Sequence, residues 1–255
     1  MPLIKNIMKI QVAQLSHIGM HRSENQDSLA FVSPQEKPVL DSRGCLLVVA
    51  DGMGGAAGGR MASQLAVTAI SEIYFQENHE PLESLKSAIE QANSRIFERA
   101  QSETNLNGMG TTVTAVIFVD GRYVSGHVGD TRLYRLRSAN LQRLTSDHSM
   151  VAQMVRDGIL SEKEARRHPQ RNILLRSVGI HPNITMDLQS DQIQAGDLYL
   201  LCTDGLHGLV EDEEIASVLS HGSPDEACTA LVDLANSRGG YDNISVLVAK
   251  IQEDV

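Results

Sequence analysis

The sequence predicts an α+β fold in which a central antiparallel β-sandwich carries a pair of helices on each outer side. Two observations support this fold class. The expected strands are mostly joined by hairpin turns, and the expected helices follow one another in pairs. Such segregation is typical of antiparallel α+β domains, whereas alternating strands and helices indicate a parallel sheet. Two sheets packed face to face, with a helix pair on each outer side, would bury all the apolar faces.

The N-terminal half is expected to form three strands and then two helices. Residues 10–15 and 28–32 have the pattern of strands, and the unbroken apolar run of residues 45–50 predicts a strand buried on both faces. Apolar residues recur at helical spacing over residues 62–73 and again over residues 82–96, which indicates two amphipathic helices. The helices are consecutive, because no strand pattern separates them.

The C-terminal half is expected to begin with a β-meander, since the Asp120-Gly121 pair between two apolar runs is a hairpin signal. The strands of this half are expected at residues 111–119, 123–128, 133–136, 141–144, 184–188, 197–202 and 243–251. Its two longer helices are expected at residues 211–220 and 224–237. Between residues 148 and 179 the strand pattern stops, and we expect short helices there. Capping boxes are predicted to begin at Ser161 and Ser223.

The composition is that of a globular protein with one large core or two small ones. The chain has 255 residues, of which 42% are hydrophobic, and no long linker divides it, so a single domain 1–255 is expected. A net charge of −10 argues against binding to nucleic acid or to an anionic membrane. No apolar stretch approaches the roughly 20 residues of a membrane span, and Met1–Lys9 is too polar for a signal peptide. The three cysteines lie in apolar runs and are expected to be buried, reduced thiols of a cytoplasmic protein.

Acidic residues stand where three apolar runs end or begin. Asp51-Gly52 ends the run of residues 45–50, Asp204 follows the run of residues 198–203, and Asp242 lies just before the run of residues 244–248. Any one of them is typical of a turn, but three together indicate a site for a hard cation. Carboxylate and carbonyl oxygens suit Mg²⁺ or Mn²⁺. The glycine after the first acid would let its own carbonyl join such a site.

The same region also fits a dinucleotide-binding fingerprint. Residues 52–57 read G-x-G-x-x-A after a strand, and Glu72 lies about 20 residues further on. Two features argue against this alternative. A second helix follows the first, so there is no βαβ unit, and Asp51 would place a carboxylate beside the pyrophosphate. This alternative predicts nicotinamide or flavin binding without metal dependence.

Other phosphate chemistries lack their motifs. The chain has no Gly-Lys pair, no Cys-x₅-Arg and no G-x-S-x-G, which excludes a P-loop, a cysteine phosphatase loop and a serine nucleophile elbow. Arg22 lies in a polar loop, and in a phosphate enzyme its guanidinium would match phosphate oxygens. Asp130 ends a further strand, where an acid by itself is typical of a turn. His148 and His168 are more typical of turn or packing residues than of ligands, and no spacing indicates zinc.

Six motifs occur in one order along the chain: R-x-x-N-Q-D, D-G-M-G-G, G-D-T-R, D-H-x₁₉-H-P-x-R-N, T-D-G and D-N-x-S-V. Together they resemble the PPM family, the metal-dependent (type 2C) protein serine/threonine phosphatases, in its compact bacterial form. The resemblance covers about residues 11–250. It implies a β-sandwich flanked by helix pairs, hydrolysis of phosphoserine and phosphothreonine in proteins, and two or three divalent cations, Mg²⁺ or Mn²⁺.

The resemblance also implies the ligands of the cations. Asp51 would bridge two cations, one of which would also bind the Gly52 carbonyl. Asp204 and Asp242 would hold the other. Asp130 would share a third, more loosely held cation with Asp204.

Further roles follow from the same resemblance. Arg22 would bind the phosphate, Asp27 would orient a metal-bound water, and residues 148–179 would form a flap that touches the substrate. Met53 stands where many eukaryotic members have a histidine proposed to protonate the leaving group, and Gln26 replaces a frequent acid. The proton donor for the leaving group is therefore open, with a water on the third cation as one candidate.

The physics of phosphomonoester hydrolysis agrees with this reading. Two cations neutralise the phosphate and make a bridging hydroxide available near neutral pH, so that it can attack directly. No covalent intermediate is needed, in line with the missing nucleophile motifs. The alternative function on this fold is a non-catalytic, phosphoprotein-binding regulatory module. The expected partners are proteins phosphorylated on Ser or Thr, together with a partner protein kinase, and the chain is expected to be a monomer.

Overall fold

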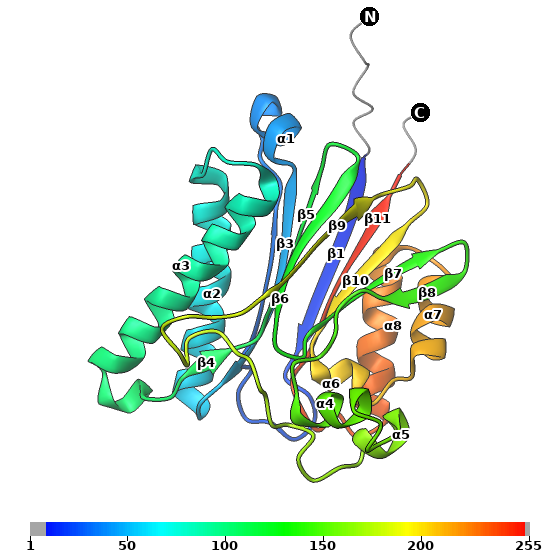
Figure 1. The fold of residues 1–255 in the computed structure, drawn as a ribbon. Coiled ribbons are helices and arrows are strands. Elements are labelled where there is room, and N and C mark those ends of the chain that lie inside the picture. Colours follow the sequence, from blue (N-terminus) through cyan, green and yellow to red (C-terminus); the bar gives the residue numbers. More distant parts are fainter. Residues whose placement is uncertain (1–8, 253–255) are drawn as a thin grey trace, which may run out of the picture.

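Two antiparallel sheets packed face to face form the centre of the molecule (Figure 1). The computed structural model of the chain describes residues 9–252, apart from the side chains of Ala56 and Ala57. The five-stranded sheet has the order β1 (Ile10–His17), β11 (Ile244–Ile251), β10 (Leu198–Cys202), β7 (Arg132–Arg137), β8 (Asn140–Arg143). The six-stranded sheet has the order β2 (Asp27–Val32), β3 (Cys45–Met53), β5 (Val113–Val119), β6 (Arg122–Val128), β9 (Asp187–Gln192), with the short β4 (Gly110–Thr111) paired to β3.

A helix pair covers the outer face of each sheet (Figure 1). The pair on the six-stranded sheet is α2 (Ala56–Gln76) and α3 (Pro81–Ser102), and the pair on the five-stranded sheet is α7 (Asp212–Leu219) and α8 (Pro224–Ser237). Shorter helices are α1 (Lys37–Arg43), the 3₁₀ turn η1 (Thr104–Leu106), α4 (Met150–Arg156), α5 (Glu162–Ala165) and α6 (Asp204–His207). The predicted α+β sandwich with flanking helix pairs is therefore confirmed.

The core has three layers, as the alternation of side chains along β3 shows. Leu46 and Val48 pack among the residues of α2 and α3, whereas Leu47 and Val49 pack between the sheets against Leu201 and its neighbours. A third cluster fills the space between the five-stranded sheet and α8. Because β3 has a hydrophobic layer on each side, its sequence is an unbroken apolar run.

Most of the predicted helices and strands are found, and the structure contains the turn and the helix caps that predicted them. Asp120 and Gly121 both have positive φ angles, 53° and 72°, as a two-residue hairpin turn requires. Both predicted capping boxes are present, at Ser161 and at Ser223. The cysteines are buried and free. Within the described residues, no helix is long and apolar enough to cross a membrane.

Several elements differ from the prediction. The strand expected at 111–119 is divided into β4 and β5, and the 3₁₀ turn η1 was not expected. The strand expected at 184–188 is instead β9, Asp187–Gln192, which is polar because it lies at the sheet edge and pairs only with β6. Ile184 and Met186 precede it and pack against the core outside any strand. The short helices α1 and α6 were not expected from the pattern, since neither is long enough to show a helical period. The predicted absence of a signal peptide at the N-terminus falls mostly on residues 1–8, outside the described part.

Candidate metal centre

Four aspartates from four different parts of the chain line one cleft of about 370 Å³ at an end of the sandwich, and Glu24 lines it as well. Asp51 lies two residues before the end of β3, and Asp130 lies in the turn between β6 and β7. Asp204 is the first residue of α6, directly after β10, and Asp242 lies in the loop before β11. Asp51 belongs to the six-stranded sheet, Asp130 lies where the chain crosses from that sheet to the five-stranded one, and the last two flank strands of the five-stranded sheet. The cleft is therefore assembled from both halves of the sandwich.

Gly52 lines the cleft next to Asp51, and close packing explains why it is a glycine. A Cβ atom at this position would lie 2.0 Å from the Gly59 carbonyl oxygen and 2.8 Å from the Gln26 carbonyl oxygen. The backbone of the first turn of α2 therefore lies directly against Gly52. The Gly52 N–H donates to the Gln26 carbonyl at 3.1 Å, which joins this strand end to the β1–β2 loop.

Asp27 lies behind the cleft. It pairs with Asp51 in the β2–β3 ladder and is almost fully buried. Thr203 donates its hydroxyl to Asp27 Oδ2 at 2.9 Å, whereas Oδ1 is buried and has no hydrogen-bond partner. Burial, partly offset by hydroxyl hydrogen bonds, raises the pKa of Asp27 to about 7.

Arg22 contributes positive charge to the cleft. Its guanidinium donates to Asp242 Oδ2 at 2.7 Å, and half of its side-chain surface is exposed. The hydrogen bond and the charge of Asp242 raise the pKa of Arg22. Asn243 holds the same loop in place, because its amide donates to the backbone carbonyls of Ile18 and Glu24.

The cleft acids repel one another. Burial, followed by the neighbouring carboxylates, raises the pKa of Asp51 well above its ordinary value, and the pKa of Asp130 is raised well above it for the same two reasons. Burial and then Asp242 raise the pKa of Asp204 to about 6. Asp204 Oδ1 is also buried without a hydrogen-bond partner. Clustered oxygen donors that lack compensating charge fit divalent cations such as Mg²⁺ or Mn²⁺.

The acids nevertheless do not converge on one point. Among the described residues, no three His, Cys, Asp or Glu side chains form a group that could hold a metal ion as placed. One contact bears on this: Asp242 faces Arg22, which donates to its Oδ2 at 2.7 Å. Binding of a cation by Asp242 would require this carboxylate to exchange Arg22 for the cation.

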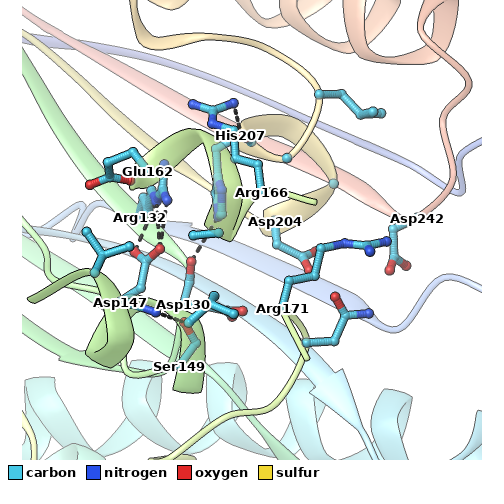
Figure 2. A pocket seen from close by; sticks show the side chains of 18 of the residues that line it. Asp130, Arg132, Asp147, Ser149, Glu162, Arg166, Arg171, Asp204, His207 and Asp242 are labelled. Carbon is cyan, nitrogen blue, oxygen red and sulfur yellow. Dashed lines mark hydrogen bonds and ion pairs between the residues drawn. The ribbon is translucent and has the colours of Figure 1, made fainter. Parts of the chain in front are cut away.

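Several residues that support the site were not predicted. Thr112 Oγ1 accepts from the Asp51 N–H at 3.0 Å, and His207 Nε2 lies 3.0 Å from the Asp130 carbonyl oxygen (Figure 2). Burial, and then the charge of Arg132, lowers the pKa of His207 to about 3. His207 is therefore neutral near pH 7 and donates to this carbonyl. No local pattern distinguishes these residues, since each acts only through tertiary contacts.

Neither histidine singled out in the sequence lies in the cleft. His148 is buried at the start of the 148–179 segment, where its Nδ1 accepts from the Gly129 N–H at 3.1 Å and its Nε2 lies 3.1 Å from Asp187. His168 Nδ1 accepts from the Gln170 N–H in a local turn. The dinucleotide alternative is also wrong, because β3 leads into α2 and then directly into α3, with no βαβ unit.

Comparisons with known proteins agree with this architecture. Residues 15–233 match the family described as Protein phosphatase 2C. The chain is 36% identical over 239 residues to "Serine/threonine phosphatase stp" of Listeria monocytogenes, covering 91% of this chain and 92% of that protein. It is 30% identical over 250 residues to "Protein phosphatase PhpP" of Streptococcus pneumoniae, covering 96% and 99%.

Solved structures show the same likeness in three dimensions. The serine/threonine phosphatase PstP/Ppp of Mycobacterium tuberculosis superposes with a TM-score of 0.85 at 36% identity, over 97% of this chain and all of that chain. The catalytic domain of PstP in complex with two manganese ions gives a TM-score of 0.85 at 34% identity, over 96% and 100%. The chain described here belongs to the protein phosphatase 2C family.

Proposed function

We propose that this chain hydrolyses phosphoserine and phosphothreonine esters of proteins with the help of Mg²⁺ or Mn²⁺. One observation supports this above all: four aspartates from separate parts of the chain line one cleft together with a half-exposed arginine. Such a cleft combines ligands for hard cations with a donor for phosphate oxygens. The whole chain, residues 1–255, would act as one phosphatase domain.

The cation ligands are proposed from this placement. Asp51, the Gly52 carbonyl, Asp204 and Asp242 would hold two cations, and Asp130 would share a third with Asp204. When bound, the cations supply Lewis-acid neutralisation of phosphate charge and lower the pKa of water. The structure supports this assignment through the buried, unpartnered Asp204 Oδ1 and the raised pKa values of these acids.

Arg22 and Asp27 would act differently from the ligands. Arg22 lies at the cleft and would donate N–H groups to the phosphate oxygens, which fixes the orientation of the ester. Asp27 does not line the cleft. It would orient water through its neighbours, since it pairs with Asp51 and accepts from Thr203. Its pKa of about 7 would let it hold or release a proton near neutral pH.

No side chain of the cleft is an evident proton donor for the leaving group. Met53 carries no proton to donate, and the His207 ring lies against the backbone carbonyl of Asp130 and has a pKa of about 3. The proton would then come from water in the cleft. The proposed partners are phosphoproteins and a protein kinase that phosphorylates them, with the chain acting as a cytoplasmic monomer. The segment 148–179 would act as the flap that contacts the substrate.

The decisive experiment measures hydrolysis of p-nitrophenyl phosphate and of phosphoserine and phosphothreonine peptides. Activity should require Mn²⁺ or Mg²⁺, disappear in excess EDTA and return with added metal. Asp51→Asn should lose activity by orders of magnitude while its circular dichroism spectrum is retained. Phosphopeptide binding without any hydrolysis would instead support the non-catalytic regulatory module.

A further inference from the structure

A second hollow, of about 200 Å³, adjoins the metal cleft beneath the 148–179 segment (Figure 2). We call it the side chamber. It shares four lining residues with the cleft, Asp130, Asn172, Asp204 and Asp242. Its walls come from α4 and α5 on one side and from α6 with Leu209 on the other. A substrate whose phosphate occupied the cleft could therefore extend a neighbouring side chain into the side chamber.

The charge of the side chamber is positive apart from the acids it shares with the cleft. Its lining contains four arginines that lie outside the core: Arg143, Arg156, Arg166 and Arg171. A fifth, Arg132, forms a buried ion pair with Asp147 at 2.7 Å, so these two charges cancel. Glu162 is then the remaining acid of the lining besides the three aspartates shared with the cleft, and Glu211 pairs with Arg166 from outside it. Away from the metal cleft this leaves an excess of two positive charges (four arginines minus two glutamates).

Arg143 and Arg166 have donors available for an incoming anion. Arg143 lies 3.5 Å from Glu162 on an exposed surface, longer than the 2.7–2.9 Å typical of a strong charged hydrogen bond. Arg166 donates to the His207 carbonyl at 3.2 Å and lies 2.9 Å from Glu211, which uses two of its five N–H groups. Arg156, by contrast, already donates to Ser146, Asp147 and Gln153.

We propose that the side chamber binds an anionic side chain that neighbours the phosphorylated residue of the substrate, so that the enzyme prefers acidic phosphosites. Arg143 and Arg166 would determine this specificity. The anion would be the carboxylate of Asp or Glu, or a second phosphate. Val151, Val155 and Leu209 also line the chamber and would pack against the methylene groups of that side chain. This inference rests on the proposed phosphatase function.

The structure separates two neighbouring arginines of the 148–179 segment. Arg166 lines the side chamber, whereas Arg167 is exposed and does not line it. Arg167 carries the same charge one residue away, so Arg167→Gln is a matched control. Arg143 is the better residue for the main test. It lies in β8, and replacing it removes no contact with α6, whereas Arg166 contacts the His207 carbonyl.

The first test uses phosphoserine peptides with a neutral background and a single Glu, Gln, Lys or second phosphoserine at each position near the phosphate. We expect Glu at one position to raise kcat/KM about fivefold over Gln, because a partly exposed charged hydrogen bond is formed. Lys at that position should lower it, and the gain should shrink at high salt. A larger gain with phosphoserine than with Glu would identify a second phosphate as the preferred anion. Equal kcat/KM for Glu, Gln and Lys at every position would overturn the proposal.

The second test uses variants. Arg143→Gln should abolish most of the Glu preference, Arg143→Lys should keep it, and Arg143→Glu should reverse it in favour of the Lys peptide. Arg167→Gln should keep the wild-type preference. If Arg167→Gln reduced the preference for Glu as much as Arg143→Gln, the cause would be the general positive electrostatic field of the segment. Binding in the side chamber would then be overturned.

Wild-type hydrolysis of p-nitrophenyl phosphate with Mn²⁺ tests the proposed phosphatase function separately from the proposed side chamber. No hydrolysis would overturn the proposed function itself. Hydrolysis without any peptide preference would overturn only the side chamber.

Discussion

Asp204 is a carboxylate whose burial and whose neighbour Asp242 raise its pKa to about 6 from an ordinary value of 3.8. Between these pH values the folded protein binds more protons than the unfolded chain, so the contribution of Asp204 to stability falls as the pH rises from about 4 to 6. At pH 7, without metal, the charged side chain therefore destabilises the fold. The same negative charge on Asp204 would attract and bind a divalent cation.

We therefore expect Asp204→Asn to stabilise the metal-free protein at pH 7, by on the order of 1–2 kcal/mol. Urea unfolding in EDTA would measure the difference from wild type, which should vanish near pH 4, where Asp204 is protonated. With saturating Mn²⁺ the variant should gain less stability than wild type and lose turnover by orders of magnitude. A stability difference that did not depend on pH, or near-normal turnover, would contradict this assignment.

Arg22 forms an ion pair with Asp242 at 2.7 Å. A cation that bound Asp242 would release the guanidinium toward the phosphate. Arg22→Ala should then raise KM for p-nitrophenyl phosphate and the inhibition constant of inorganic phosphate, each about tenfold. The Mn²⁺ concentration for half-maximal activity should not rise.

A second arginine provides the control for Arg22→Ala. Arg60 pairs with Glu24 at 2.9 Å and does not line the cleft, so Arg60→Ala should leave both constants unchanged. If Arg22→Ala also leaves both unchanged, its loop is only a solvated surface.

At the scale of elements, His148 joins the 148–179 segment to the turn that carries Asp130. Its Nδ1 accepts from the Gly129 N–H, so the proton lies on Nε2 and is donated to Asp187 at the start of β9. The Gly129 carbonyl also accepts from the His148 N–H at 2.7 Å. One buried side chain thus links a turn, a sheet edge and the start of the segment.

Two replacements separate these links. His148→Asn keeps an acceptor near the Nδ1 position, whereas His148→Gln keeps a donor near the Nε2 position. We expect His148→Gln to raise the Mn²⁺ requirement for activity, because the buried Gly129 N–H loses a partner worth about 1–3 kcal/mol. His148→Asn should instead raise KM for phosphopeptides with less effect on metal. Metal titrations and peptide kinetics of both variants test this, and identical behaviour would mean that the histidine only fills space.

At the scale of the molecule, the acids belong to connections of both sheets. Asp51 lies near the end of a strand of the six-stranded sheet, whereas Asp204 and Asp242 flank strands of the five-stranded sheet. A cation held by all three would connect the two halves of the sandwich. Metal binding should therefore stabilise the whole fold and not only the loops.

We expect Mn²⁺ at about 100 times its Kd to add about 2.7 kcal/mol to the free energy of unfolding. For a chain of this size, that corresponds to a rise in Tm of about 5–10 °C. Thermal unfolding with and without Mn²⁺ would measure it, EDTA should reverse it, and Asp204→Asn should weaken it. A Tm that is independent of Mn²⁺ would argue against a cation shared between the sheets.

The sequence alone determined the fold class and most elements, because their signals are local. The unbroken apolar run of β3, the helical stripes of α2 and α3 and the Asp-Gly hairpin turn each depend on neighbouring residues. The capping boxes at Ser161 and Ser223 do so as well. The acids could be singled out in the same way, since each stands where an apolar run ends or begins. The ordered motifs then identified the family.

Only the tertiary structure decided how these residues meet. That Asp27 lies behind Asp51, that Arg22 pairs with Asp242, and that the acids do not yet converge all depend on contacts between distant segments. The predicted position of the edge strand β9 was wrong for the same reason, because its polar sequence forms a strand only by pairing with β6. The side chamber is a further case: Arg166 lines it and Arg167 does not, although the two are adjacent in sequence. Periodicity and motifs report on the chain near each residue, whereas the charge and shape of a cleft depend on which distant segments the packing brings together.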